Sequence, residues 1–149
     1  MSLLTKDYKH GQSINMIKEA VVLAGGLGTR LRGVVKDIPK PMAPIGERPF
    51  LAFLLDYLAY YKIERVVLSV GYKWEVIEEC FGSEYKGMKL FYAVEEEPLG
   101  TGGGIANALQ HLNNEDFILL NGDTFFNVDL LKLQETFYHS NADLCLTLK

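Results

Sequence analysis

The sequence VVLAGGLGTRLR, residues 21–32, is the most informative segment of this chain. An apolar run from Ala20 to Ala24 changes abruptly into a loop that contains three glycines and ends in Thr29 and Arg30. Glycine lets the backbone approach a ligand closely, and the N–H groups of such a loop suit phosphate oxygens. Arg30 adds a permanent charge on a planar group that matches phosphate. The segment predicts a strand leading into a nucleotide or polyphosphate site or, more simply, a tight strand-to-helix turn.

Two common phosphate-binding motifs match this segment poorly. The dinucleotide fingerprint G-x-G-x-x-G would begin at Gly26, but Leu31 stands where its last glycine is needed. The phosphate loop of NTPases requires Gly-Lys followed by Ser or Thr, and this tripeptide occurs nowhere in the chain. Both of these interpretations of the loop are therefore weak.

Composition narrows the class of protein further. The chain has 149 residues, of which 48% are hydrophobic and 23% charged, as expected for one globular domain. A net charge of −4 without a basic block argues against nucleic acid as a partner. No apolar run reaches the roughly 18 residues that cross a bilayer, so we expect no membrane insertion. Residues 1–15 are expected to be a flexible N-terminal extension without a secretory signal, and residues 16–149 the folded part.

The two cysteines indicate a reducing compartment. Cys80 and Cys145 are far apart and lack metal-binding spacing, so we interpret them as reduced core thiols in a cytoplasmic protein.

Hydrophobic periodicity and glycine or proline punctuation predict an alternation of strands and helices. Strands are expected at 17–24, 65–70, 88–94, 116–120 and 142–148. Helices are expected at 50–61, at 74–81 before Gly82, from the glycine cluster 99–104 to about 112, and at 129–138 after the N-cap Asp129. Residues 33–46 carry three prolines and predict an extended, ordered loop. The helix at 50–61 is apolar on several sides, which predicts burial or a subunit contact and permits a homodimer.

This alternation predicts an α/β fold: a Rossmann-like, doubly wound, mainly parallel sheet. In such sheets ligands bind beyond the carboxyl ends of the strands, where the strand order reverses. The loops after the first, third and fourth predicted strands are the unusual ones, and all three follow strand ends. We therefore expect them to meet at one edge of the sheet.

Lys40 and Asp123 are the charged residues that could carry chemistry there. Lys40 lies between two prolines in IPKPM, which would hold its ammonium in place near phosphates; the alternative is a solvated surface lysine. Asp123 follows a strand in NGD and offers a carboxylate of the kind that Mg²⁺ takes together with substrate phosphates. The alternative for Asp123 is an Asp-stabilised turn.

The acidic run Glu95–Glu97 precedes the second glycine cluster. A carboxylate can accept two hydrogen bonds from an N–H/NH₂ edge, which guanine presents and uracil or thymine does not, so these glutamates could select the base. The alternative is an exposed acidic strand end.

Four segments in this order, LAGGLGTRL (23–31), IPKPM (38–42), EPLGTGG (97–103) and NGD (121–123), resemble the sugar-1-phosphate nucleotidyltransferases. Among them, the guanylyltransferases that act on mannose 1-phosphate or manno-heptose 1-phosphate are the most similar. The resemblance implies a Mg²⁺-dependent reaction in which an NTP, here GTP, and a sugar 1-phosphate give an NDP-sugar and pyrophosphate. The same family includes uridylyl-, thymidylyl- and cytidylyltransferases, and related non-catalytic regulatory subunits share its fold.

Carried over by position, the resemblance implies a role for each matched residue. Arg30, Lys40 and Asp123 would be catalytic, with Arg30 on the leaving pyrophosphate, Lys40 on the reacting phosphates and Asp123 on the metal. The nucleotide would contact Leu23, Ala24, Gly25, Gly26, Gly28, Thr29, Arg30, Glu97, Gly100, Thr101 and Gly102. Members of this family generally continue well past the position of Lys149. We therefore expect this chain to be their nucleotide-binding part, truncated before a sugar-binding region, and to turn over poorly alone.

Overall fold

The computed structural model describes residues 16–25 and 38–148 of the chain. The predicted extension 1–15 and the segment 26–37 lie outside these residues. The chain divides into two compact units: Lys18–Phe125 form one, and Ile17 with the residues from Phe126 onward belongs to the other. The larger unit contains the sheet together with Lys40, Glu95 and Asp123.

The larger unit is built on a five-stranded sheet in the order β5-β6-β4-β1-β7. Its strands are β1 (Glu19–Leu23), β4 (Arg65–Val70), β5 (Glu84–Tyr85), β6 (Met88–Val94) and β7 (Ile118–Asn121). Strand β1 pairs in parallel with β4 and β7, and β4 pairs in parallel with β6. Only the short β5 runs antiparallel among these described strands. The predicted mainly parallel α/β sheet is therefore confirmed.

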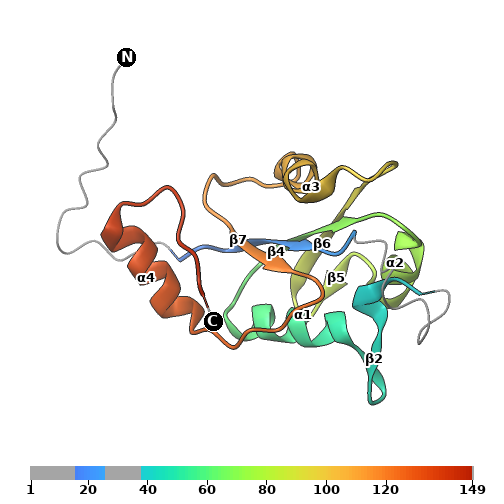
Figure 1. Cartoon of the computed structure of the whole chain (residues 1–149). Coiled ribbons are helices and arrows are strands. Elements are labelled where there is room, and N and C mark those ends of the chain that lie inside the picture. The colour runs from blue at the N-terminus through green and yellow to red at the C-terminus, as the bar shows by residue number, and fades with distance from the viewer. Residues whose placement is uncertain (1–15, 26–37, 149) are drawn as a thin grey trace. The chain divides into compact units, whose positions relative to one another are not determined.

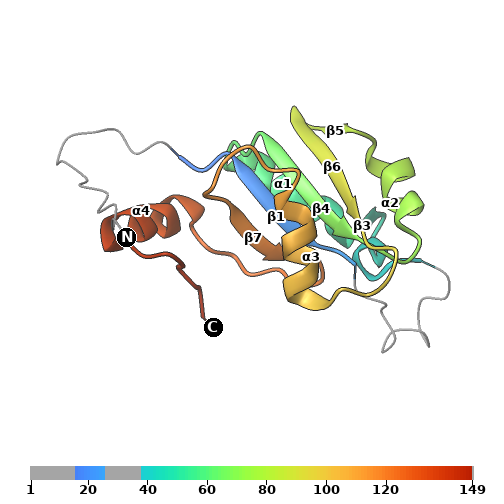
Figure 2. The same ribbon diagram turned by 90° about the horizontal axis from the view of Figure 1, so that it is seen from above.

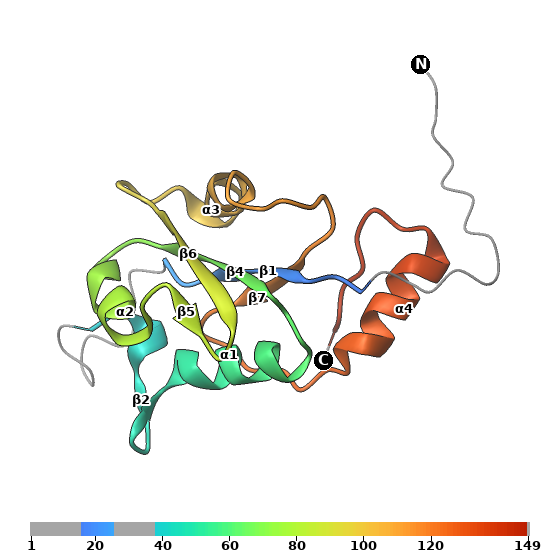
Figure 3. The same cartoon turned by 180° about the vertical axis from the view of Figure 1, so that it is seen from behind.

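Helices cover both faces of this sheet. Helix α1 (Phe50–Tyr60) lies on one face and α3 (Gly100–Leu109) on the other, and the view from behind shows the same layers (Figures 1 and 3). Alternate strand residues point to opposite faces, so Val21 and Val67 pack with Ala108 of α3 in one buried cluster. On α1, the leucines at 51, 54, 55 and 58 are buried. This helix therefore buries much of its apolar surface within its own chain.

The remaining elements of the larger unit are short. A 3₁₀ turn, η2 (Lys40–Met42), is followed by a hairpin of β2 (Pro44–Ile45) and β3 (Arg48–Pro49), with Gly46 at φ +63° in its turn. The sequence predicted only an extended loop here. Helix α2 (Trp74–Phe81) ends at Gly82 with φ +62°, where the sequence placed its end.

Strand order reverses at β1, because β4 and β6 lie on one side of it and β7 on the other. The view from above shows this arrangement, with α3 across the sheet (Figure 2). The register places Leu23 of β1 level with Ser69 of β4 and Asn121 of β7. The carboxyl ends of these strands therefore meet at one edge, as the sequence predicted.

The second unit contains α4 (Leu130–Ser140). The carboxylate of Asp129 accepts hydrogen bonds from the N–H groups of Leu131 and Lys132, which confirms Asp129 as the N-cap. In the same unit, the Ile17 N–H donates to the side-chain oxygen of Gln134 at 2.6 Å.

Two predictions from the sequence are wrong. Residues 142–148 form no strand; Leu144, Leu146 and Leu148 alternate as in a strand but are 69–87% exposed, and no backbone pairs with them among the described residues. Cys80 and Cys145 are free thiols, but neither is a core residue, since Cys80 is exposed and Cys145 half-buried. Cys80 is exposed because α2 turns Ile77 and Phe81 inward, which leaves its side chain on the outer face.

An ion pair between a buried carboxylate and a partly buried arginine lies at the other end of the sheet, where β1 and β4 begin. The carboxylate of Glu19, only 3% exposed, lies 3.0 Å from Nε of Arg65 and accepts hydrogen bonds from the N–H groups of Asn113 and Asn114. Removing one partner of such a pair leaves a buried charge uncompensated.

We therefore expect Glu19→Ala to lower the free energy of unfolding by about 3 kcal/mol, because Arg65 loses its carboxylate partner and two N–H groups lose their acceptor. Urea titration followed by circular dichroism measures this change. Glu64→Ala is the control, since the Glu64 side chain is 71% exposed in its pair with Lys18 and should contribute less than about 1 kcal/mol. An equal loss in both variants would contradict the role assigned to the Glu19–Arg65 pair.

Candidate nucleotide-binding site

A cavity of about 410 Å³ opens where the four parallel strands end. Strand β1 contributes Leu23, β4 contributes Ser69 and β7 contributes Asn121. The cavity is lined by Leu23, Ala24, Gly25, Lys40, Pro41, Ser69, Glu95, Pro98, Gly100, Thr101, Asn121 and Asp123. Its size falls in the range typical of small-molecule and cofactor sites.

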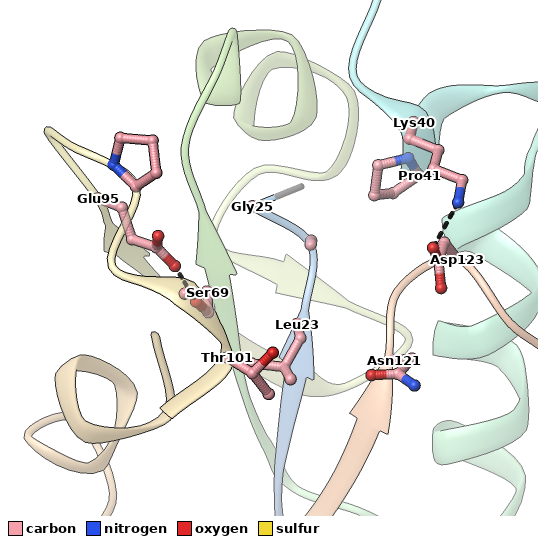
Figure 4. A pocket seen from close by; sticks show the side chains of 12 residues that line it. Leu23, Gly25, Lys40, Pro41, Ser69, Glu95, Thr101, Asn121 and Asp123 are labelled. Carbon is pink, nitrogen blue, oxygen red and sulfur yellow. Dashed lines mark hydrogen bonds and ion pairs between the residues drawn. The ribbon is translucent and has the colours of Figure 1, made fainter. Parts of the chain in front are cut away.

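Lys40 and Asp123 form one side of this cavity (Figure 4). The Nζ of Lys40 lies 2.5 Å from Oδ2 of Asp123, and both side chains remain more than a third exposed. Lys40 begins the 3₁₀ turn η2, whose other end is fixed by a hydrogen bond from the Ala43 N–H to the Lys40 carbonyl. The sequence separates the two charges by 83 positions, and the fold brings them together.

The hydrogen bond from Lys40 holds the pKa of the Asp123 carboxyl below its ordinary value, against the opposing effect of partial burial. The Thr124 hydroxyl donates to the other oxygen, Oδ1, and lowers the pKa further. Asp123 is therefore ionised at neutral pH and can serve as a ligand for a cation.

This pKa gives a direct test of the pair. We expect the Asp123 carboxyl to titrate below the usual range of aspartate in the wild-type protein and to move upward in Lys40→Met, because the main cause of the lowering is removed. Carboxyl ¹³C chemical shifts followed by NMR between pH 2 and pH 6, a window of roughly two units either side of the ordinary value, report both titrations. An unchanged Asp123 titration would show that the two groups do not pair in solution.

Glu95 and Ser69 form the other side of the cavity (Figure 4). The Ser69 hydroxyl donates to Oε1 of Glu95 at 2.9 Å, and the Leu99 N–H donates to Oε2 at 3.1 Å. Leu99 is the residue that precedes α3, so the start of this helix also lies at the cavity. The free N–H groups at a helix N-terminus favour negative charge.

Glycine at two positions allows the strand ends to approach one another. A Cβ on Gly122 would lie 2.6 Å from the backbone oxygen of Leu23, to which the Gly122 N–H donates. A Cβ on Gly25 would lie 3.1 Å from Oε1 of Glu95. Larger residues at these positions would separate β1 from β7 or push the carboxylate away.

The residues predicted from the sequence have different positions. Leu23, Ala24, Gly25, Lys40, Gly100, Thr101 and Asp123 line the cavity. Glu97 and Gly102 are exposed and are not among its lining residues. Gly26, Gly28, Thr29 and Arg30 lie outside the described residues. Their contacts with a nucleotide thus stay predictions.

Sequence reasoning missed Ser69 and did not single out Glu95 from its acidic run. Ser69 is the one hydroxyl in the otherwise apolar end of β4, VVLSV, and is 1% exposed. A polar residue at the carboxyl end of a buried strand is the signal that could have identified it.

Comparison with known proteins agrees with the motifs. The sequence profile described as nucleotidyl transferase matches residues 19–149. A D-glycero-alpha-D-manno-heptose 1-phosphate guanylyltransferase of Campylobacter jejuni is 51% identical over 88% of this chain and 57% of its own length. A mannose-1-phosphate guanylyltransferase of Mycobacterium tuberculosis is 44% identical over 87% of this chain and 36% of its own length.

A solved structure has the same fold. The crystal structure of HddC from Yersinia pseudotuberculosis complexed with GMP-PN superposes with a TM-score of 0.72 at 41% identity, over 85% of this chain and 55% of that one. The chain thus spans about half the length of these relatives, or less. With a profile match over most of its length and relatives that share its motifs, the chain belongs to the nucleotidyl transferase family.

Proposed function

We propose that this protein transfers a nucleotidyl group from GTP to the phosphate of a manno-configured sugar 1-phosphate, releasing pyrophosphate. One observation carries the proposal: a single cavity holds the Lys40–Asp123 pair on one side and the Glu95 carboxylate on the other. The Lys40–Asp123 pair suits the phosphates of a nucleotide, and the Glu95 carboxylate suits a base with N–H donors. The named activities of the relatives support the same choice.

The chemistry requires positioning and charge neutralisation more than a protein base. A sugar phosphate oxygen is already a nucleophile; it forms a bond to the α-phosphorus while the bond to the pyrophosphate oxygen breaks. Negative charge builds up on the phosphate oxygens during this step. The Lys40 ammonium, held at the cavity wall by η2, would neutralise part of that charge. Arg30 is proposed to hold the leaving pyrophosphate.

Asp123 is the proposed ligand for Mg²⁺. Its ionised carboxylate lines the cavity, and Mg²⁺ commonly takes one or two carboxylates together with substrate phosphates and waters. Among the described residues no group of three or more His, Cys, Asp or Glu could hold a metal, so a site here would depend on the nucleotide for further ligands. When bound, Mg²⁺ supplies positive charge beside the phosphates.

Glu95 is proposed to recognise the base through hydrogen bonds to its carboxylate. Its two oxygens each accept one hydrogen bond within the protein, and each carboxylate oxygen has capacity for another. Guanine offers N1–H and N2–H₂ on one edge and could occupy both positions. Glu97 remains a second proposed contact from the family resemblance.

Pyrophosphate release by the whole protein tests the reaction. With mannose 1-phosphate or manno-heptose 1-phosphate, Mg²⁺ and each NTP in turn, we expect turnover with GTP to exceed turnover with UTP, dTTP or CTP. Turnover with UTP, dTTP or CTP but none with GTP would contradict the base assignment. Absence of turnover and of calorimetric GTP binding would instead favour a non-catalytic regulatory subunit.

Two further expectations belong to the same proposal. The substrates are small soluble metabolites, which suits a cytoplasmic enzyme. Among the described residues, no helix is long and apolar enough to cross a membrane.

Tyr60 on α1 is 76% exposed, which leaves part of this helix accessible for a homodimer. Sedimentation velocity would report the dimer.

A further inference from the structure

The Glu95 carboxylate is held by donors from two separate parts of the fold. The Ser69 hydroxyl at the end of β4 donates to Oε1, and the Leu99 N–H before α3 donates to Oε2. The backbone position of Glu95 is fixed as well, because its N–H donates to the Val70 carbonyl at 2.7 Å. The carboxylate plane is therefore defined by two hydrogen bonds that approach from different elements.

Glycine on α3 leaves room for this arrangement. A Cβ on Gly104 would lie 2.7 Å from Oε1 of Glu95 and 2.9 Å from Oγ of Ser69. Since both distances are below any normal contact, the hydrogen-bonded pair lies directly against the backbone of α3. A Cβ on Gly25 would lie 3.1 Å from the same carboxylate oxygen.

The environment of Ser69 gives its hydroxyl a defined task. Ser69 is 1% exposed in a strand whose other residues are largely apolar and buried. A buried hydroxyl without a partner is costly, so its bond to Glu95 is expected to persist. The terminal torsion of a glutamate side chain is otherwise broad. Ser69 thus restricts the rotation of a carboxylate that lines the cavity.

We infer that Ser69 is a positioning residue for base recognition: its hydroxyl orients the Glu95 carboxylate toward a base that presents two adjacent N–H donors. This inference rests on the proposed function, because it concerns how the same site selects guanine. Ser69 acts through Glu95. A carboxylate fixed in advance loses less orientational freedom on binding, so the protein gains affinity for the correct base.

The test compares GTP with ITP in the whole protein, because ITP keeps the N1–H of guanine and lacks the 2-amino group. Steady-state KM and kcat are measured for both nucleotides in the wild type, Ser69→Ala, Glu95→Gln and the double variant. We expect Ser69→Ala to raise KM for GTP about tenfold, the effect of losing one hydrogen bond to a charged group, with a much smaller change for ITP and for kcat. Circular dichroism and thermal unfolding confirm that each variant folds.

The double variant separates positioning from general destabilisation. The preference for GTP is expressed as the GTP/ITP ratio, which is kcat/KM for GTP divided by kcat/KM for ITP. If Ser69 acts through Glu95, Ser69→Ala in the Glu95→Gln background should change this ratio little further, because the carboxylate that Ser69 orients is already gone. Gly104→Ala provides a second route, since its added methyl would displace the same carboxylate. Gly104→Ala should therefore lower the GTP/ITP ratio, as Ser69→Ala does.

Each outcome has a distinct meaning. A wild-type protein that does not prefer GTP to ITP would overturn the proposed contact between Glu95 and the 2-amino group of guanine, and a protein that turns over neither nucleotide would overturn the proposed function. A wild type that prefers GTP, with a Ser69→Ala variant that keeps this preference or loses activity equally with both nucleotides, would overturn the role of Ser69 alone.

Discussion

Replacement of Lys40 by methionine is expected to lower kcat for nucleotidyl transfer by about 10²–10³, because one preorganised charge is removed from the transition state. Methionine keeps much of the length of the side chain and removes the ammonium that lies beside Asp123. KM for the nucleotide should change less than kcat, since charge on the reacting phosphates grows in the transition state. Single-turnover measurements in the whole protein separate the two effects.

Lys18→Met is the matched control for this prediction. Lys18 also pairs with a carboxylate, Glu64, and its side chain is 40% exposed, close to the 35% of Lys40. Lys18 is not among the residues that line the cavity, so its loss should leave kcat within about twofold of wild type, as for most surface substitutions. A Lys40→Met variant with wild-type kcat would remove Lys40 from the mechanism.

Glu95→Gln is expected to lower kcat/KM for GTP by roughly 10–100-fold, the discrimination typical of a bidentate side-chain–base contact. A glutamine has one acceptor oxygen and an NH₂ group, and the NH₂ would face an N–H of guanine. Uracil presents one N–H between carbonyl oxygens and can pair with an amide, so kcat/KM for UTP should rise. The ratio of kcat/KM for GTP to kcat/KM for UTP should therefore fall by a larger factor than kcat/KM for GTP alone. Competition between the two nucleotides measures that ratio.

Variants of the neighbouring glutamates test which carboxylate reads the base. Glu96→Gln is the control, because Glu96 is exposed and is not among the cavity-lining residues. Glu97→Gln examines the contact that the family resemblance implies. A lost GTP preference in Glu97→Gln with an unchanged preference in Glu95→Gln would assign the base to Glu97.

Predictions from the sequence succeeded where local patterns determine the structure. The strands 65–70 and 88–94 agree residue for residue with β4 and β6, because each is an apolar run with clear flanking residues. The helix 50–61 agrees to one residue with α1. The prediction that three loops meet at one edge followed from their position after the carboxyl ends of parallel strands, and the described parts of those loops do line one cavity.

Predictions failed where a distant partner decides the outcome. Residues 142–148 alternate as a strand does, but alternation does not supply a neighbouring strand. The β2–β3 hairpin was missed because its prolines argue against strands, although Pro44 and Pro49 pair at its open end. The choice of Glu95 depends on the bend at Glu96 and Glu97, after which the Leu99 N–H donates to the Glu95 carboxylate. The pattern of the acidic run does not predict this hydrogen bond, because it depends on the path of the backbone between Glu95 and Leu99.

The most direct test of the proposed site is a crystal structure of the whole protein with a non-hydrolysable GTP analogue and Mg²⁺. We predict guanine on the Glu95 side of the cavity, with N1–H and N2–H₂ on its carboxylate oxygens, and the α-phosphate beside Lys40 and Asp123. Phosphates at the Glu95 side with the base beside Lys40, or a nucleotide bound outside this cavity, would contradict the assignment of the two sides.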